Sequence, residues 1–153
     1  MKLFLRFSPT KTMRQLMVLL LAAAAFNADV SAKPLVRCEV TYAGTTHIID
    51  SIINNNPDVD AGGAYIAEAS DIGGRFRFKT IMLGKNDALT TIKIYVFYEA
   101  RRQPVLLQEV KYEAPFSLSK KPHDLTGMNY LYSPPLGREL QYGCALLDDN
   151  KND

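Results

Sequence analysis

The chain has 153 residues, 47% of them hydrophobic, and its 18 basic and 16 acidic residues leave a formal net charge of +2. That nearly even balance does not indicate nucleic acid or an anionic membrane as a partner, and no catalytic or nucleotide-binding motif stands out. Two cysteines and two distant histidines make a poor case for zinc, so we expect no metal and no other cofactor.

Residues 1–32 have the pattern of a cleavable secretory signal peptide. Four basic residues and no acidic one precede an apolar run over 16–26, which is shorter than the roughly 20 residues of a membrane-spanning helix. Residues 30–32 are small enough for signal peptidase, and no lipid-attachment cysteine follows the run. A buried amphipathic helix is the alternative, but the run is apolar all round.

The signal-peptide pattern predicts export, and removal of the segment changes the net charge of the chain. We expect a released, periplasmic or secreted protein of bacterial type, with no membrane span once the signal is removed. Residues 33–153 hold 14 basic and 15 acidic residues, so the basic excess belongs to the targeting signal. We expect a single β domain at 33–147 and a flexible polar tail at 148–153.

Cys38 and Cys144 are the only cysteines, and each lies in an apolar segment near one end of the mature chain. In an oxidising compartment, two such thiols most simply form a disulfide. Their spacing is wrong for a C-x-x-C redox motif. On the chain-entropy model, a bridge that closes a loop of roughly 100 residues contributes about 4–5 kcal/mol to stability.

Alternation of apolar and polar residues predicts strands along the first half of the mature chain. Residues 35–42 alternate with Cys38 on the inward side, and the β-branched run over 45–53 predicts a second strand. Turn-forming residues fill 54–63. At 64–69 we expect a short strand, with one helical turn as the alternative.

The second half of the chain continues the same pattern. Strands are expected at 75–83, 90–99, 105–112 and 139–147, with a strand fragment at 128–132 inside a long irregular segment over 116–136. Residues 84–87 are expected to form a turn. The run over 90–99 is apolar on both faces, which indicates a central position in the sheet.

Seven to eight strands at hairpin spacing, with no long helix, predict an all-β fold. The candidates are an antiparallel β-sandwich (immunoglobulin-like) and a small β-barrel, each with one disulfide joining its first and last strands. The chain has no tryptophan, whereas true immunoglobulin domains carry one beside their disulfide.

Two surfaces are candidates for binding. Arg75, Arg77 and Lys79 alternate with Phe76 and Phe78, so we expect the three cations to share one strand face as a positive stripe, which could bind an anionic partner or guard a sheet edge. Lys93 and Lys111 would reinforce it from neighbouring strands. Tyr130 and Tyr132 offer rigid aromatic contact area, or else pack the long segment against the domain.

The histidines are weak catalytic candidates. His47 and Asp50 are three residues apart in a predicted strand, so their side chains point to opposite faces. His123 lies in the long irregular segment, with no nucleophile motif beside it. We therefore expect no catalytic residues.

The sequence thus favours a non-catalytic binding role outside the cytoplasm, with an envelope or extracellular protein or an anionic polymer as partner. Two alternatives remain. The domain could be a carrier whose barrel cavity is lined by Phe76, Phe78, Ile92 or Ile94, or a small hydrolase built on one of its histidines.

Overall fold

The computed structural model describes residues 33–149 apart from 61–62, 66–67 and 87, so the expected signal peptide over 1–32 lies outside the described residues. The described part consists mostly of strands, with short 3₁₀ segments at Pro57–Val59 and Gly63–Tyr65, which confirms the all-β prediction. The strands are β1 (Pro34–Tyr42), β2 (Thr45–Asn54), β3 (Ser70–Ile72), β4 (Phe76–Lys85), β5 (Ala88–Tyr98), β6 (Val105–Glu113), β7 (Met128–Ser133) and β8 (Arg138–Asp148). Within this part of the chain, no helix is long and apolar enough to cross a membrane.

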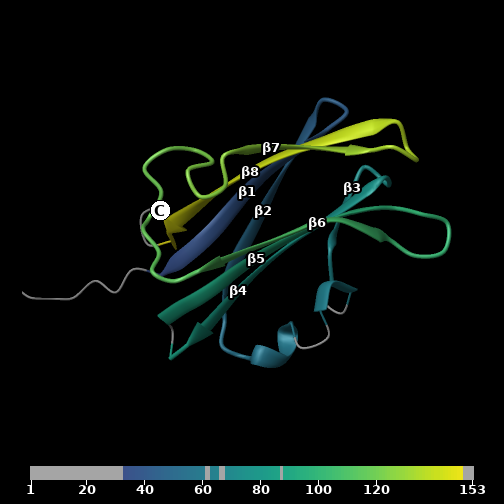
Figure 1. Ribbon diagram of the computed structural model, residues 1–153. Coiled ribbons are helices and arrows are strands. Elements are labelled where there is room, and N and C mark those ends of the chain that lie inside the picture. The colour runs from purple at the N-terminus through teal and green to yellow at the C-terminus, as the bar shows by residue number, and fades with distance from the viewer. Residues whose placement is uncertain (1–32, 61–62, 66–67, 87, 150–153) are drawn as a thin grey trace, which may run out of the picture. The chain divides into compact units, whose positions relative to one another are not determined.

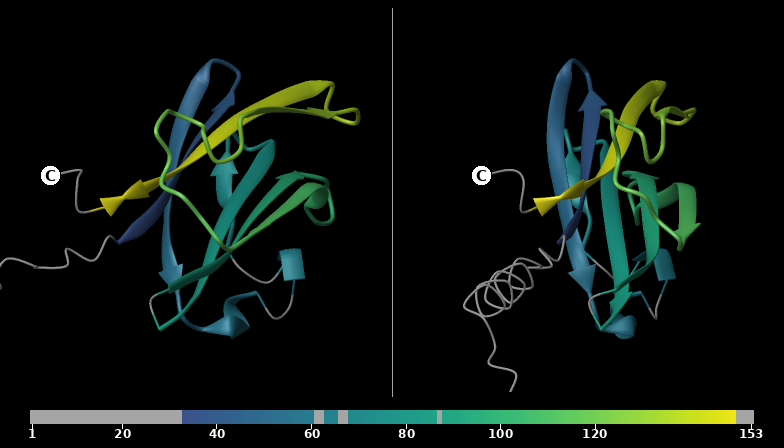
Figure 2. Two further views of the ribbon diagram at one scale, coloured as in Figure 1. Left: turned by 60° about the vertical axis from the view of Figure 1, so that its left-hand side comes forward. Right: turned by 90° about the vertical axis from the view of Figure 1, so that its left-hand side faces the viewer.

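The eight strands form one sheet, in the order β6-β5-β4-β2-β1-β8-β7, with β3 paired to β4. Figure 1 shows the sheet folded over on itself, with β1, β7 and β8 above and β4, β5 and β6 below. In the two views of Figure 2, β2 runs from the first group of strands down to the second. The result is a sheet of eight strands nearly closed into a barrel.

The two halves of the sheet meet at one parallel contact, which the expected antiparallel fold did not include. Ile53 and Asn54, at the end of β2, pair with Met82 and Leu83 of β4, whereas the other strand pairs are antiparallel. Gly84 permits this close approach. A Cβ at that position would lie 2.3 Å from Cγ2 of Ile53.

The predicted disulfide is confirmed, and it lies at the centre of the core. Cys38 and Cys144 are directly opposite each other in the β1–β8 pair, with their Cα atoms 4.1 Å apart. Phe78 and Tyr142, from opposite halves of the sheet, pack around it with ring centroids 5.2 Å apart. The Tyr142 hydroxyl donates a hydrogen bond of 2.7 Å to Gln108, which ties β8 to β6.

A second, smaller core covers the outer side of β4 and β5. Val59 and Ala64, in the segment that follows β2, pack against Ile81, Tyr95 and Phe97. Because β5 lies between β4 and β6 and is buried on both faces, its predicted central position is confirmed.

Two local predictions differ from the structure. Residues 64–69 were expected to form a strand, with one helical turn as the alternative; a 3₁₀ turn occupies Gly63–Tyr65 and the strand begins only at Ser70. Residues 84–87 were expected to form a turn, and the turn is present but begins only at Asn86, because β4 continues through a register shift at Leu83/Gly84 to Lys85.

Candidate binding face and loop pocket

The three cations of the expected positive stripe lie in three different environments. Arg75 is exposed, and Arg77 forms an ion pair with Glu99. Lys79 is only 4% exposed, so its expected place on a solvent-facing stripe is wrong. The segment that carries Ala64 covers this side of β4, and alternation along β4 could not reveal that cover. A binding role for Arg75 and Arg77 stays a prediction.

Lys79 instead belongs to a buried polar cluster. Its Nζ donates a hydrogen bond of 2.8 Å to the carbonyl of Ala64 and lies 4.7 Å from the centroid of the Tyr95 ring. Burial lowers the pKa of this lysine, although the nearby carboxylate of Asp60 acts in the opposite direction. The side chain therefore fastens the covering segment to the sheet.

Asp60 anchors the same segment, and sequence reasoning missed it. Its nearly buried carboxylate forms an ion pair with Lys93 and accepts a hydrogen bond of 2.9 Å from the Tyr95 hydroxyl. Burial, followed by this hydrogen bond, raises the pKa of Tyr95. Lys93 and Lys111, expected to reinforce a positive stripe, are paired with Asp60 and Glu113.

Tyr130 and Tyr132 lie in β7, and both point to solvent, with exposures of 62% and 59%. They share the outer side of the β2-β1-β8-β7 half of the sheet with other exposed apolar residues. We call this surface the outer face and define it by Ile48, Ile52, Met128, Tyr130 and Tyr132. These are five of the eight large apolar side chains that the described residues expose.

One ion pair of the outer face joins β1 and β2. Arg37 donates two hydrogen bonds to Asp50, at 2.8 and 2.7 Å, between adjacent strands. Glu39 lies beside them in β1 and is bonded to His123 at 3.0 Å. Arg37 and Asp50 therefore neutralise each other, and Glu139 adds a further carboxylate opposite Tyr132.

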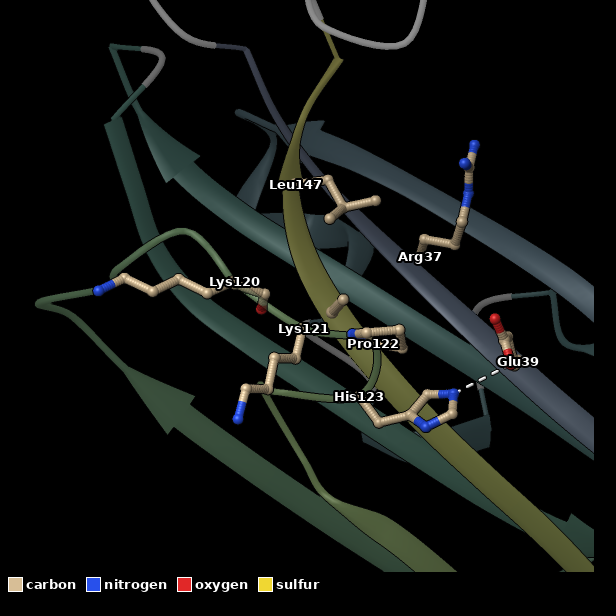
Figure 3. A pocket seen from close by; sticks show the side chains of 9 residues that line it. Arg37, Glu39, Lys120, Lys121, Pro122, His123 and Leu147 are labelled. Atoms are coloured by element: carbon tan, nitrogen blue, oxygen red, sulfur yellow. Dashed lines mark hydrogen bonds and ion pairs between the residues drawn. The ribbon is translucent and has the colours of Figure 1, made fainter.

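His123 reaches this face from the segment between β6 and β7. Its backbone has φ of +61°, and its ring lies directly over Gly143 of β8, where a Cβ would be 2.4 Å from the ring carbon Cγ. Nε2 then meets Oε2 of Glu39 across the strand, as Figure 3 shows. Only glycine at 143 leaves room for this arrangement.

A pocket of about 300 Å³ lies beside the histidine. Arg37, Glu39, Pro122 and Leu147 are among its lining residues. In Figure 3 the amino groups of the two lining lysines point away from Glu39 and Arg37. The pocket therefore lacks converging cations that would hold an anion.

The same segment covers the edge of β8 where β7 does not reach it. The N–H of Leu125 donates to the carbonyl of Cys144 at 3.1 Å, and the N–H of Cys144 donates to Oγ1 of Thr126 at 2.8 Å. Further along, the N–H of Ser119 donates to the carbonyl of Leu146 at 2.7 Å. These bonds fix the segment and, with it, His123.

The geometry gives the two histidines different surroundings. His47 lies opposite Val40 in the β1–β2 pair, and Asp50 is bonded to Arg37, so the histidine and this carboxylate are not partners. His123 has a carboxylate partner in Glu39. The hydroxyl of Ser119, in the same pocket, is engaged by the N–H of Leu146 at 2.8 Å.

Metal and cavity sites gain no support from the described residues. Their His, Cys, Asp and Glu side chains include no group of three or more that could hold a metal ion. Phe76, Phe78, Ile92 and Ile94 are fully buried in the main core, and three pockets at the surface of the described residues are lined by other side chains. Comparison of the chain with protein-family models, curated proteins and solved structures finds no match.

Proposed function

We propose that this chain is a non-catalytic binding domain that acts outside the cytoplasm and contacts a protein or a surface polymer through its outer face. One observation carries the proposal: Met128, Tyr130 and Tyr132 are exposed next to one another along β7, and Ile48 and Ile52 are exposed on the same side of this half-sheet, in β2. Tyrosine supplies contact area at low entropy cost and is enriched where proteins bind one another. An exposed cluster of this kind is typical of an interaction surface.

The compartment rests on two supports. The Cys38–Cys144 disulfide is typical of oxidising compartments, and residues 1–32 have the pattern of a signal peptide. If export occurs with cleavage before Lys33, N-terminal sequencing of the exported protein will read Lys-Pro-Leu-Val. An intact Met1 on protein from the cytoplasm would contradict it.

The charges favour a partner without a strong charge. Arg77, Lys93 and Lys111 are paired with acidic side chains and Lys79 is buried, so four of the five cations expected to form a positive stripe are paired or covered. The outer face holds the carboxylates of Glu39 and Glu139, which disfavour an anionic partner. We therefore favour a largely uncharged protein or polymer surface over an anionic one.

The test compares two pairs of substitutions in the exported protein. Tyr130→Ser with Tyr132→Ser should abolish capture of envelope material by the immobilised domain and leave unfolding unchanged. Arg75→Glu with Arg77→Glu should leave capture unchanged. Leu118→Ser, at another exposed apolar side chain, is the matched control. Capture that survives loss of the tyrosines but not reversal of the arginines would refute the proposal.

One observation favours a second candidate, the small hydrolase. The bond between Nε2 of His123 and Oε2 of Glu39 is the kind that orients a catalytic base. A nucleophile held against the other ring nitrogen is missing from the hydrogen bonds of the described residues, and we expect His123→Ala to leave binding unaffected. Loss of a hydrolytic activity in that variant would favour the hydrolase instead.

A further inference from the structure

The edge of β7 is the feature of the fold that the binding proposal does not use. β7 is the last strand of the sheet, bonded to β8 on one side, and none of the other described strands pairs with its second side. Such an edge presents a row of backbone groups that can pair with another chain.

The bonds of β8 identify which backbone groups of β7 face outward. The N–H and C=O of Cys144 point to the side of β8 that faces β7, since Thr126 and Leu125 bond them there. Because the direction of the backbone groups alternates along a strand, the N–H and C=O of Tyr142 and Leu140 also point toward β7. Their register partners in β7, Asn129 and Leu131, therefore direct their own N–H and C=O groups toward β8.

Met128, Tyr130 and Tyr132 consequently turn their N–H and C=O groups toward the open edge. Their side chains are also the exposed ones in β7, at 43%, 62% and 59%. Backbone and side chains of the same three residues are thus available to a partner.

The edge also lacks the usual protection against pairing. Natural edge strands commonly carry charged residues, a proline or a bulge that discourage another strand from adding. The sheet's opposite end, β6, carries Glu109, Lys111 and Glu113 and shows a register shift against β5. β7 has the sequence Met-Asn-Tyr-Leu-Tyr-Ser and is the only described strand without a charged residue.

We infer that the occupant of this edge is a second copy of the chain, joined by antiparallel pairing of β7 with β7 about a twofold axis at Tyr130. The three outward residues are spaced symmetrically about Tyr130, so this register sets Tyr130 opposite Tyr130 and Met128 opposite Tyr132. All three pairs are then hydrogen-bonded, giving about six bonds, whereas a shift of two residues leaves about four.

The lack of charge in β7 and the direction of its side chains both agree with pairing between two copies. A charged residue at or near the twofold axis would meet its own copy, and β7 has no charged residue. Residues that are opposite in an antiparallel pair point to the same face, so the outer faces of the two copies join into one. Most soluble oligomers are symmetric, and twofold dimers are the commonest. The inference does not depend on the proposed partner.

The test is sedimentation of the full chain up to about 1 mM, with hydrogen exchange of individual amides measured by NMR. We expect a concentration-dependent dimer, in which the amides of Met128, Tyr130 and Tyr132 become protected as concentration rises. The amides of Asn129 and Leu131 should be protected already in the monomer. A monomer at 1 mM, or a dimer without this alternate-residue protection, would overturn the inference.

Two substitutions and a control complete the test. Tyr130→Pro removes an N–H that faces outward, so the monomer loses no hydrogen bond between β7 and β8. The dimer loses bonds, so its dissociation constant should rise at least about tenfold. Tyr130→Lys sets two like charges against each other at the twofold axis and should also weaken the dimer. This variant tests β7–β7 pairing if the proline variant does not fold. Ile48→Lys, on the same face but away from the edge, should leave the dimer intact. A dimer broken by Ile48→Lys and not by the changes at Tyr130 would instead indicate face-to-face contact.

Discussion

Gly143 offers a sharp test of how the segment before β7 is held. It lies in β8, where replacing glycine by alanine ordinarily stabilises a strand by about 0.5–1 kcal/mol. Here the new Cβ would lie 2.4 Å from Cγ, 2.6 Å from Cδ2 and 2.8 Å from Cβ of His123. All three separations are shorter than real Cβ contacts, so the imidazole must leave its place over β8.

The cost should exceed the gain. Overpacking of this kind costs about 1–3 kcal/mol, and displacing the ring also breaks its bond to Glu39. We therefore expect Gly143→Ala to lower the free energy of unfolding by about 1–3 kcal/mol. In a domain of this size, each kcal/mol lowers Tm by roughly 3–6 °C.

A double-mutant cycle isolates the cause. His123→Gly removes the ring and the Cβ, and glycine suits the φ of +61° at that position. In that background Gly143→Ala should be neutral or slightly stabilising. Urea unfolding of the oxidised proteins, followed by circular dichroism, measures both effects. An equal cost of Gly143→Ala in both backgrounds would refute the steric argument.

Three further outcomes are expected. Replacing both Cys38 and Cys144 by Ala should lower the free energy of unfolding by roughly 4–5 kcal/mol in urea titrations, since the bridge spans 106 residues; an unchanged midpoint would contradict this. Thr126→Val should cost about 1–2 kcal/mol in the same assay, because the buried N–H of Cys144 loses its acceptor. Because the pKa of Tyr95 is raised in the folded protein, the unfolded state loses this proton first, and stability should fall above about pH 10. Tyr95→Phe should flatten that fall, and an unchanged slope would count against the assignment.

The sequence predicted what depends on residues near one another in the chain. Alternation identified most of the strands and set Cys38 and Cys144 inward, because one face of each strand must be buried. It also indicated that β5 is covered on both sides. Exposed tyrosines on β7 are consistent with the same rule.

What the sequence could not supply is which segments meet. Alternation assigns a side chain to a face but does not say what lies over that face. The parallel contact of β2 with β4 joins residues 29 positions apart, and the bond of His123 to Glu39 joins residues 84 positions apart. Asp60 looked like one more turn residue, because its partners Lys93 and Tyr95 lie 33 and 35 positions further along the chain.

Arg75, Arg77 and Lys79 provide a final test of whether this face of β4 is exposed or covered. On an exposed stripe, reversing any one of them would cost no more than about 0.5 kcal/mol. In the structure Lys79 is 4% exposed and lies near the carboxylate of Asp60, whereas Arg75 is exposed. Lys79→Glu would bury a second carboxylate beside the first, and we expect it to cost roughly 3–5 kcal/mol or prevent folding.

Arg75→Glu is the matched control and should cost no more than about 0.5 kcal/mol. Lys79→Met keeps the apolar stem but removes the buried charge, so it should change stability by no more than about 1 kcal/mol. Urea unfolding of the three variants separates the two arrangements, because only a covered face makes the identity of the charge at 79 matter. Equal, small costs for Lys79→Glu and Arg75→Glu would show that the segment containing Asp60 and Ala64 does not cover β4.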